Sequence, residues 1–109
     1  MNKANPGIRS KDRRPAYFVY IVRCSDGSLY TGITSDVPRR IREHNSGTAS
    51  KYTRTRTPVV LSYLEAAPGR GDALRRERQI KGLGRELKLL LCSNSSAPKG
   101  LVPAGYPSQ

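Results

Sequence analysis

Residues 17–47 read YFVYIVRCSDGSLYTGITSDVPRRIREHNSG, and this stretch decides the fold. Its first run, residues 17–23, is rich in aromatic and β-branched side chains, which favour a strand. Because apolar side chains fall on both faces of that run, we expect it to be the central strand of a sheet. Residues 25–27 supply a Ser-Asp-Gly turn, so residues 28–34 are predicted to return as the second strand of a hairpin.

Two tyrosines lie on this hairpin, Tyr20 on the first predicted strand and Tyr30 on the second. In the pleat of the second strand Tyr30 shares a face with Gly32 and Thr34, while the opposite, apolar face is expected to pack on the core. Because Gly32 has no side chain, a phosphate group or a metal ion could come close to the backbone beside Tyr30.

A helix is predicted after the hairpin, because a Ser-Asp pair can cap its first turn and an Asn-Ser-Gly run can end it. Val37 and Ile41, four residues apart, form its buried stripe. Arg40 and His44 are also four residues apart and form a neighbouring stripe. The sequence therefore predicts that an arginine and a histidine project together from one side of this helix.

Residues 48–58 are polar, basic and rich in turn-forming residues, which predicts a loop. Lys51, Arg54 and Arg56 surround Tyr52 in this segment. Positive side chains can contact phosphates and an aromatic ring can stack on a base, so the segment is a candidate contact with nucleic acid.

A second helix, predicted over residues 73–81 and capped by Asp72, carries the remaining candidate site residue. Glu77 lies on the apolar stripe of this helix, although the helix is otherwise strongly basic. Burying an ionised carboxylate without a partner costs roughly several kcal/mol, so either an arginine or a metal ion must meet Glu77. Arg76 and Lys81 on the same helix are further candidates for contact with nucleic acid.

The chain of 109 residues has 20 Lys and Arg against 8 Asp and Glu, which gives a formal net charge of +12. On so small a domain this charge creates a positive potential of several kT and predicts a polyanionic partner, with an anionic membrane surface and a ribonucleoprotein as open alternatives. We expect a soluble protein, because no run approaches the roughly 20 apolar residues that span a bilayer. The N-terminus also lacks the apolar core of a secretory signal.

The two cysteines do not suggest a shared role. Cys24 and Cys92 stand far apart, without a CxxC partner or a cluster of histidines. This spacing argues against a zinc site and against a disulfide framework, and it predicts reduced thiols in a cytoplasmic protein.

One small domain is predicted over residues 16–92, because the chain is too short for two. Residues 1–15 are expected to form a flexible basic arm and residues 93–109 a disordered tail, since neither can bury enough apolar surface to become ordered. Residues 59–65 supply a third strand and residues 85–92 a third helix. The expected fold is therefore α+β, with a three-stranded, mostly antiparallel sheet flanked by three helices.

The order of these motifs resembles the GIY-YIG endonuclease superfamily, and within it the small single-domain bacterial branch. The resemblance covers residues 16–91 and is carried by the runs LYTGIT, HNSG, KYT and ALRRE followed by IK. It assigns the two motif tyrosines, the closing glycine, the arginine, the histidine and the metal-binding glutamate of the family, in that order, to Tyr20, Tyr30, Gly32, Arg40, His44 and Glu77.

The resemblance implies an endonuclease that hydrolyses DNA phosphodiester bonds with one divalent ion, Mg²⁺ or Mn²⁺. Nothing in the chain offers base readout, so we expect either weak specificity or selectivity for DNA structure, such as branched or nicked DNA in repair or recombination. The alternatives are a nucleic-acid-binding module that has kept the fold without turnover, and an interaction domain of a larger repair complex.

Phosphodiester hydrolysis also calls for these residue types on chemical grounds. Mg²⁺ keeps several of its waters, so Glu77 alone suffices as a protein ligand. The planar guanidinium of Arg40 can pair with two oxygens of the scissile phosphate. One of Tyr30, Tyr20 and His44 then orients or deprotonates the attacking water, and we favour Tyr30 for this role.

Overall fold

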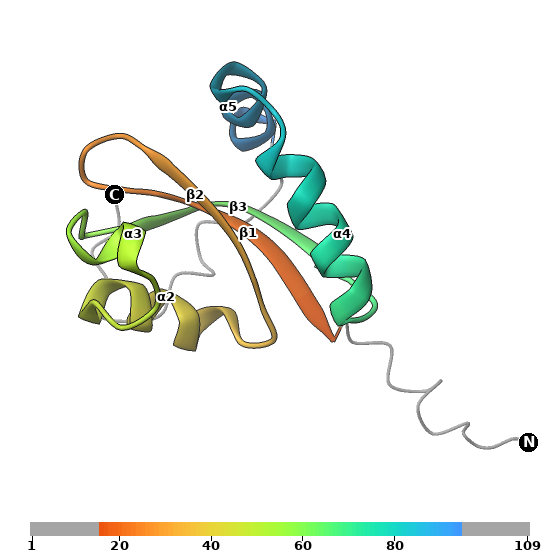
Figure 1. The fold of residues 1–109 in the computed structure, drawn as a ribbon, viewed down its shortest axis with the longest axis horizontal. Coiled ribbons are helices and arrows are strands. Elements are labelled where there is room, and N and C mark those ends of the chain that lie inside the picture. The colour runs from red at the N-terminus through yellow and green to blue at the C-terminus, as the bar shows by residue number, and fades with distance from the viewer. Residues whose placement is uncertain (1–15, 95–109) are drawn as a thin grey trace, which may run out of the picture.

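The computed structural model describes residues 16–94, which form one antiparallel sheet and four helices (Figure 1). In chain order the elements are β1 (Tyr17–Arg23), β2 (Leu29–Thr34), α2 (Val37–Ser46), α3 (Lys51–Arg54), β3 (Val60–Ala67), α4 (Arg70–Lys81) and α5 (Arg85–Ser93). The strands follow the order β2-β1-β3, and both pairs are antiparallel. The predicted α+β fold with a three-stranded sheet is therefore confirmed.

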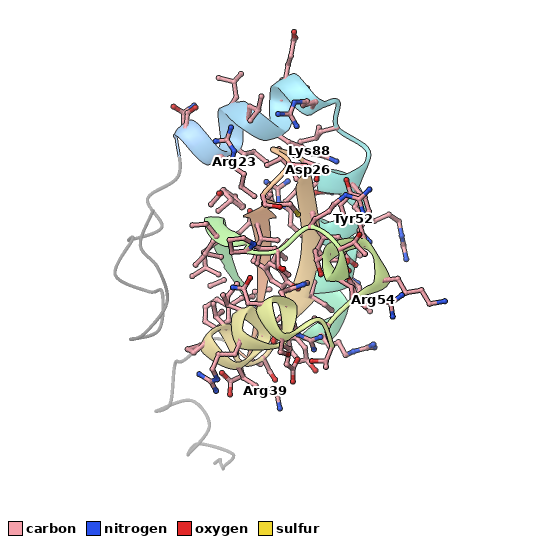
Figure 2. All side chains as sticks on the ribbon, turned by 90° about the vertical axis from the view of Figure 1, so that its left-hand side faces the viewer. Arg23, Asp26, Arg39, Tyr52, Arg54 and Lys88 are labelled. Atoms are coloured by element: carbon pink, nitrogen blue, oxygen red, sulfur yellow. The ribbon has the colours of Figure 1, made fainter. Side chains whose placement is uncertain are left out.

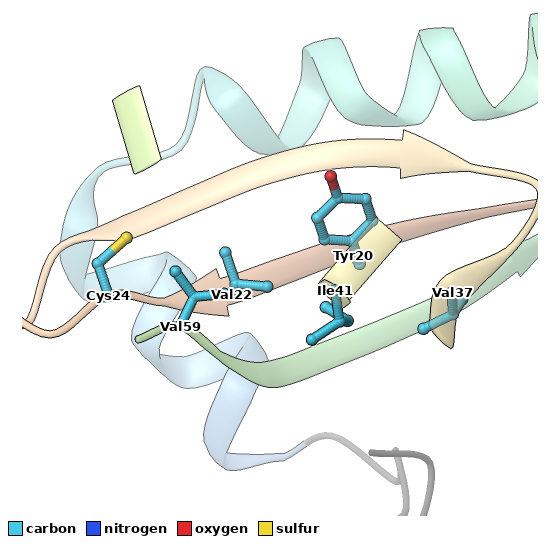
Figure 3. Close-up of a cluster of buried hydrophobic side chains, with 6 residues drawn as sticks. All are labelled: Tyr20, Val22, Cys24, Val37, Ile41 and Val59. Carbon is cyan, nitrogen blue, oxygen red and sulfur yellow. The ribbon is translucent and has the colours of Figure 1, made fainter. Parts of the chain in front are cut away.

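The central strand β1 packs on helices through both of its faces, as its two apolar faces predicted. Figure 1 shows α2 and α3 on one side of the sheet and α4 and α5 on the other. The first side holds a buried cluster made of Tyr20, Val22, Cys24, Val37, Ile41 and Val59 (Figure 3). The second side holds a cluster made of Val19, Ile21, Ala67, Ala73 and Ile80.

The first helix after the hairpin begins and ends at local signals. Asp36 is the N-cap of α2, and its carboxylate accepts a hydrogen bond from the backbone N–H of Arg39 at 3.1 Å. Gly47 follows the last helical residue with φ of 84°, a left-handed conformation that favours glycine, and its N–H bonds back to the helix. Asn45, expected to help end the helix, lies within it, and its side-chain amide bonds both backbone groups of Val59 at 2.7 and 3.2 Å.

The segment predicted as a loop over residues 48–58 contains the additional one-turn helix α3. Ser50 caps this helix, because its hydroxyl accepts a hydrogen bond from the N–H of Thr53 at 3.1 Å. The basic, turn-rich composition hid this helix, which is too short to show an apolar periodicity. Strand β3 also runs two residues past its predicted end at residue 65.

The prediction that Asp72 caps the second long helix is wrong. Helix α4 begins at Arg70 with Gly69 as its N-cap, so Asp72 lies inside the first turn. Its carboxylate pairs there with Arg75, and a negative charge in a first turn is favourable to the helix dipole. From the sequence alone, an aspartate in the first turn of a helix cannot be distinguished from an aspartate at the N-cap.

The two predicted terminal segments fall outside the described residues, apart from the start of the tail. Helix α5 extends to Ser93, where the tail was expected to begin. Both cysteines are unpaired, Cys24 buried and Cys92 half-buried, and burial raises the pKa of each thiol. Within residues 16–94 no helix is long and apolar enough to cross a membrane.

The space that the sequence left open above Gly32 is filled by the ring of Tyr20. The two residues lie opposite each other in the β1–β2 pair. A Cβ atom added at Gly32 would lie 2.5 Å from Oη and 2.7 Å from Cζ of Tyr20. Glycine is needed here because an aromatic ring, and not a ligand, crosses the backbone.

We predict that Gly32→Ala destabilises the protein by about 1–3 kcal/mol, because the added methyl group overpacks against a buried ring. Gly71→Ala is the matched control, since a Cβ at this helical position would meet nothing closer than 3.7 Å. This control should be neutral or stabilising by up to about 1 kcal/mol. Urea unfolding of the three proteins measures both effects, and equal stabilities of the two variants would contradict the prediction.

Candidate active site

The centre of the candidate site is a buried hydrogen bond between Tyr20 of β1 and His44 of α2. The phenol Oη lies 2.8 Å from Nε2 of the imidazole, and the two residues are 2% and 1% exposed. The rings meet edge to face, with centroids 5.7 Å apart. Tyr20 of the hairpin and His44 of the following helix thus meet, and His44 faces the core.

The second imidazole nitrogen bonds to a residue that the sequence analysis missed. His44 Nδ1 lies 2.7 Å from Oγ1 of Thr53, which is completely buried on α3. Thr53 Oγ1 in turn lies 2.9 Å from Oγ of Ser50. A chain of four polar side chains therefore leads from β1 through α2 to α3. The Ser-x-x-Thr spacing in the KYT region was the available signal for this contact.

Burial keeps both members of the central pair neutral. Desolvation, followed by the positive charge of Arg40, lowers the pKa of His44 to about 4. Desolvation, followed by the charge of Tyr30, raises the pKa of Tyr20 far above its usual range. His44 Nε2 is the one hydrogen-bond partner of the Tyr20 hydroxyl among the described residues, so this O–H is satisfied only when it donates to Nε2. In that tautomer the Nδ1–H of His44 donates to Thr53.

Tyr30 of β2 completes a line of aromatic rings on the same side of the sheet. Its ring meets His44 edge to face at 5.3 Å and stacks on Tyr52 at 5.9 Å, measured between centroids. The guanidinium of Arg56 lies 4.0 Å from the centroid of Tyr52. The ring of Tyr52 therefore already contacts a tyrosine and an arginine, although the residue is 40% exposed.

Arg40 brings an unsatisfied donor to this group. Its Nε is buried and has no hydrogen-bond partner among the described residues, although it lies 3.5 Å from Oε1 of Glu43. A buried guanidinium N–H without a partner is costly, and an anionic oxygen would satisfy it. Arg40 also lowers the pKa of both Tyr20 and His44, so its charge acts on the central pair.

Glu77 of α4 is mostly buried, with its side chain 18% exposed, and it does meet a cation. The partner is Lys81, at 3.2 Å, and not the arginine that was considered. The charge of Glu77 contributes to raising the pKa of Tyr20, together with those of Tyr30 and Glu43. A carboxylate from the far side of the sheet therefore acts on the same phenol as the residues of the hairpin and α2.

A divalent ion fits this donor set in only one way. No group of three or more His, Cys, Asp or Glu residues in the part of the chain described could hold a metal. Mg²⁺ accepts one carboxylate when waters and substrate oxygens complete its shell, which Glu77 can supply. Such an ion would compete with Lys81, which contacts Oε2 of Glu77; the lysine side chain is 52% exposed, and an ion pair this accessible is weak.

The other basic residues predicted to contact nucleic acid differ in whether their charged groups already have hydrogen-bond acceptors within the protein. Arg76 donates through Nε to both oxygens of Glu65, at 2.9 and 3.0 Å. Arg56 donates to Asp26 and to the carbonyl of Tyr52. Lys51 and Arg54 are exposed on α3, the helix that also carries Tyr52 (Figure 2).

Comparison with known proteins places the site within a described domain type. The profile of the GIY-YIG catalytic domain matches residues 16–89, which include every residue of the candidate site. A UPF0213 protein of Desulfotalea psychrophila is 48% identical over 101 residues, covering 92% of this chain and 90% of the relative. A UPF0213 protein of Haloquadratum walsbyi is 54% identical over 80 residues, covering 73% and 90%. The solution NMR structure of a protein from E. faecalis has a TM-score of 0.50 at 33% identity, covering 84% and 93%.

The depressed pKa of His44 predicts a loss of stability in acid. The unfolded chain takes up this proton near pH 6.5 and the folded chain near pH 4. The contribution is therefore fully present above pH 6.5 and is lost as the pH falls towards 4, by on the order of 3 kcal/mol.

The chain has one histidine, so its imidazole signal can be followed by NMR without overlap. It should titrate near pH 4, and urea unfolding at pH 7 and pH 4.5 should show a larger acid loss for wild type than for His44→Gln. An imidazole that titrates near pH 6.5 would show that the buried pair is absent in solution.

Proposed function

The chain belongs to the GIY-YIG family, and on this premise we propose that it is a divalent-metal-dependent endonuclease that hydrolyses DNA phosphodiester bonds. The observation that carries the proposal is the buried Nε of Arg40, which has no hydrogen bond among the described residues and only a long, 3.5 Å contact with Glu43 Oε1. Arg40, Tyr30 and Glu77 each act electrostatically on Tyr20, and these are the groups that phosphodiester hydrolysis calls for. A scissile phosphate would supply the well-aligned hydrogen-bond acceptor that Glu43 does not provide.

The roles of the two tyrosines and the histidine follow from their exposure. His44 is buried and uses both ring nitrogens, so its imidazole cannot reach a water at the phosphate. It holds the phenol of Tyr20 in place and is a positioning residue. Tyr30 is only half-buried and forms no hydrogen bond with its phenol among the described residues. We assign to Tyr30 the contact with the attacking water.

Arg40 and a bound divalent ion would both stabilise the negative charge of the phosphate during hydrolysis. Hydrolysis forms a bond between a water oxygen and phosphorus and breaks one P–O ester bond. The attacking water gives up a proton, and the leaving oxygen of the cut strand takes one up. Arg40 neutralises charge on the phosphate oxygens. Glu77 would hold a Mg²⁺ or Mn²⁺ ion, which when bound would supply further charge neutralisation and lower the pKa of water. Neither group reads a base, which supports selection of branched or nicked DNA by structure, in repair or recombination.

One observation favours the second candidate, a nucleic-acid-binding module without turnover. Glu77, the candidate ligand for the metal, is already paired with Lys81. If that pair persists in the presence of divalent metal and DNA, the remaining basic residues would still bind phosphates but no hydrolysis would follow. The two candidates therefore differ in what happens when Glu77 is changed.

We predict that Glu77→Gln lowers the rate of plasmid nicking in Mg²⁺ or Mn²⁺ by about 10³-fold or more, because the metal contribution of several kcal/mol is lost. DNA binding measured in EDTA should be retained, since the change removes a negative charge. Glu86→Gln on the exposed first turn of α5 is the matched control and should nick at the wild-type rate. Equal nicking by wild type and Glu77→Gln would reject the enzyme and leave the binding module.

A second prediction concerns the shape of the cation. Arg40→Lys keeps the charge but removes the planar fork, and it should lower the nicking rate by about 10²-fold. Arg39→Lys, one residue earlier and with a more exposed side chain, should have little effect. Single-turnover nicking of the two variants measures the difference, and equal rates would remove Arg40 from the phosphate site.

A further inference from the structure

A shallow pocket of about 240 Å³ lies on the outer edge of β2, beside the aromatic contacts of Tyr30 and Tyr52. Tyr30 and Thr31 of the strand line it, together with Tyr52, Lys81 and Lys88. Tyr52 belongs to α3 on one side of the sheet and Lys88 to α5 on the other (Figure 2). The pocket therefore joins the two sides around the sheet edge, and it shares Tyr30 with the candidate site.

The lining of this pocket is positively charged. Lys88 is half-buried, and no carboxylate of residues 16–94 lies within ion-pair distance of its ammonium group. Lys81 has Glu77 as its one partner in the described part of the chain. No acidic side chain lines the pocket. A partly buried lysine without a counter-charge favours an anionic ligand.

The backbone of Thr31 adds a donor. Cys24 N–H donates to Ser28 O at 2.8 Å, which makes these residues a hydrogen-bonded pair of the hairpin. Such pairs alternate along an antiparallel ladder, so the Ile21 and Thr31 pair is one whose peptide groups turn outward. The N–H of Thr31 therefore faces the outer edge of β2. The side-chain oxygen of Thr31 is also buried without a hydrogen-bond partner in the described residues.

The ligand that matches these donors is a phosphate group and not a base. Backbone N–H groups and lysines bind phosphate oxygens, whereas Tyr52 already stacks on Tyr30 and Arg56. We propose that this pocket is a second phosphate site, which holds a DNA backbone phosphate next to the scissile one. The proposal rests on the proposed function, because the shared wall at Tyr30 is what makes the two phosphates neighbours.

The slope of DNA affinity against salt concentration measures how many phosphate contacts the protein makes. Binding of a fluorescent duplex is measured by anisotropy in EDTA, so that no strand is cut. Lys88→Gln should lower affinity at every salt concentration and make the slope of log K against log[salt] shallower by about 0.9, while Lys88→Arg keeps the wild-type slope. Arg70→Gln removes the same charge at the opposite end of α4 from Lys81 and should leave the slope unchanged.

The amide of Thr31 gives a second readout by NMR. Titration with the duplex should shift this signal in wild type but not in Lys88→Gln, whose dispersed spectrum also shows that the variant folds. Inorganic phosphate at the same phosphate concentration should leave the signal in place. An equal shift with inorganic phosphate would make the pocket a site for free phosphate and would overturn the proposal.

The outcomes for the pocket and for the enzyme can be told apart. A wild-type slope for Lys88→Gln, or an equal change with Arg70→Gln, rejects the second phosphate site even if the protein nicks DNA. Failure of wild type to bind or nick any DNA rejects the proposed function and the pocket with it.

Discussion

The packing of the Tyr20 ring across Gly32, with its hydroxyl on His44, is the contact on which the rest of the structure depends. It joins β1 to β2 through the glycine and β1 to α2 through the imidazole. The imidazole then continues to Thr53 on α3. Four elements are therefore held by one buried ring, and because interiors are close-packed, any displacement of that ring moves the polar groups attached to it.

The sequence predicts the parts of this arrangement that depend on local pattern. Alternation of apolar residues and the Ser-Asp-Gly turn predicted the hairpin and the central position of β1, and spacing of four predicted the buried face of α2. The role of Thr53 could not be predicted in the same way, because the helix α3 consists of one turn and its buried hydroxyl is explained only by a histidine nine residues away. Burial of His44 likewise depends on tertiary packing, which the helical spacing with Arg40 does not reveal.

The net charge predicted a polyanionic partner more securely than it predicted the contacting residues. Arg56 bonds to Asp26, 30 residues away, and Arg76 bonds to Glu65, 11 residues away. Such pairs are visible only after the chain has folded. Lys88, by contrast, lines the β2 pocket without an acidic partner in the described residues, although nothing in its sequence context marked it. An excess of basic residues therefore indicates the class of ligand, and folding decides which of those residues remain available.

The buried pair also limits how the proposed hydrolysis can work. A general base must reach the proton that it removes, and two of the three groups considered from the sequence are enclosed. Tyr20 resists ionisation because its phenol is desolvated, and His44 remains neutral for the same reason. Proton transfer through them would require charge to form inside the core, which is costly. In the proposed hydrolysis their contribution is therefore rigidity, and activation of the water would fall to Tyr30, the charge of Arg40 and an ion held by Glu77.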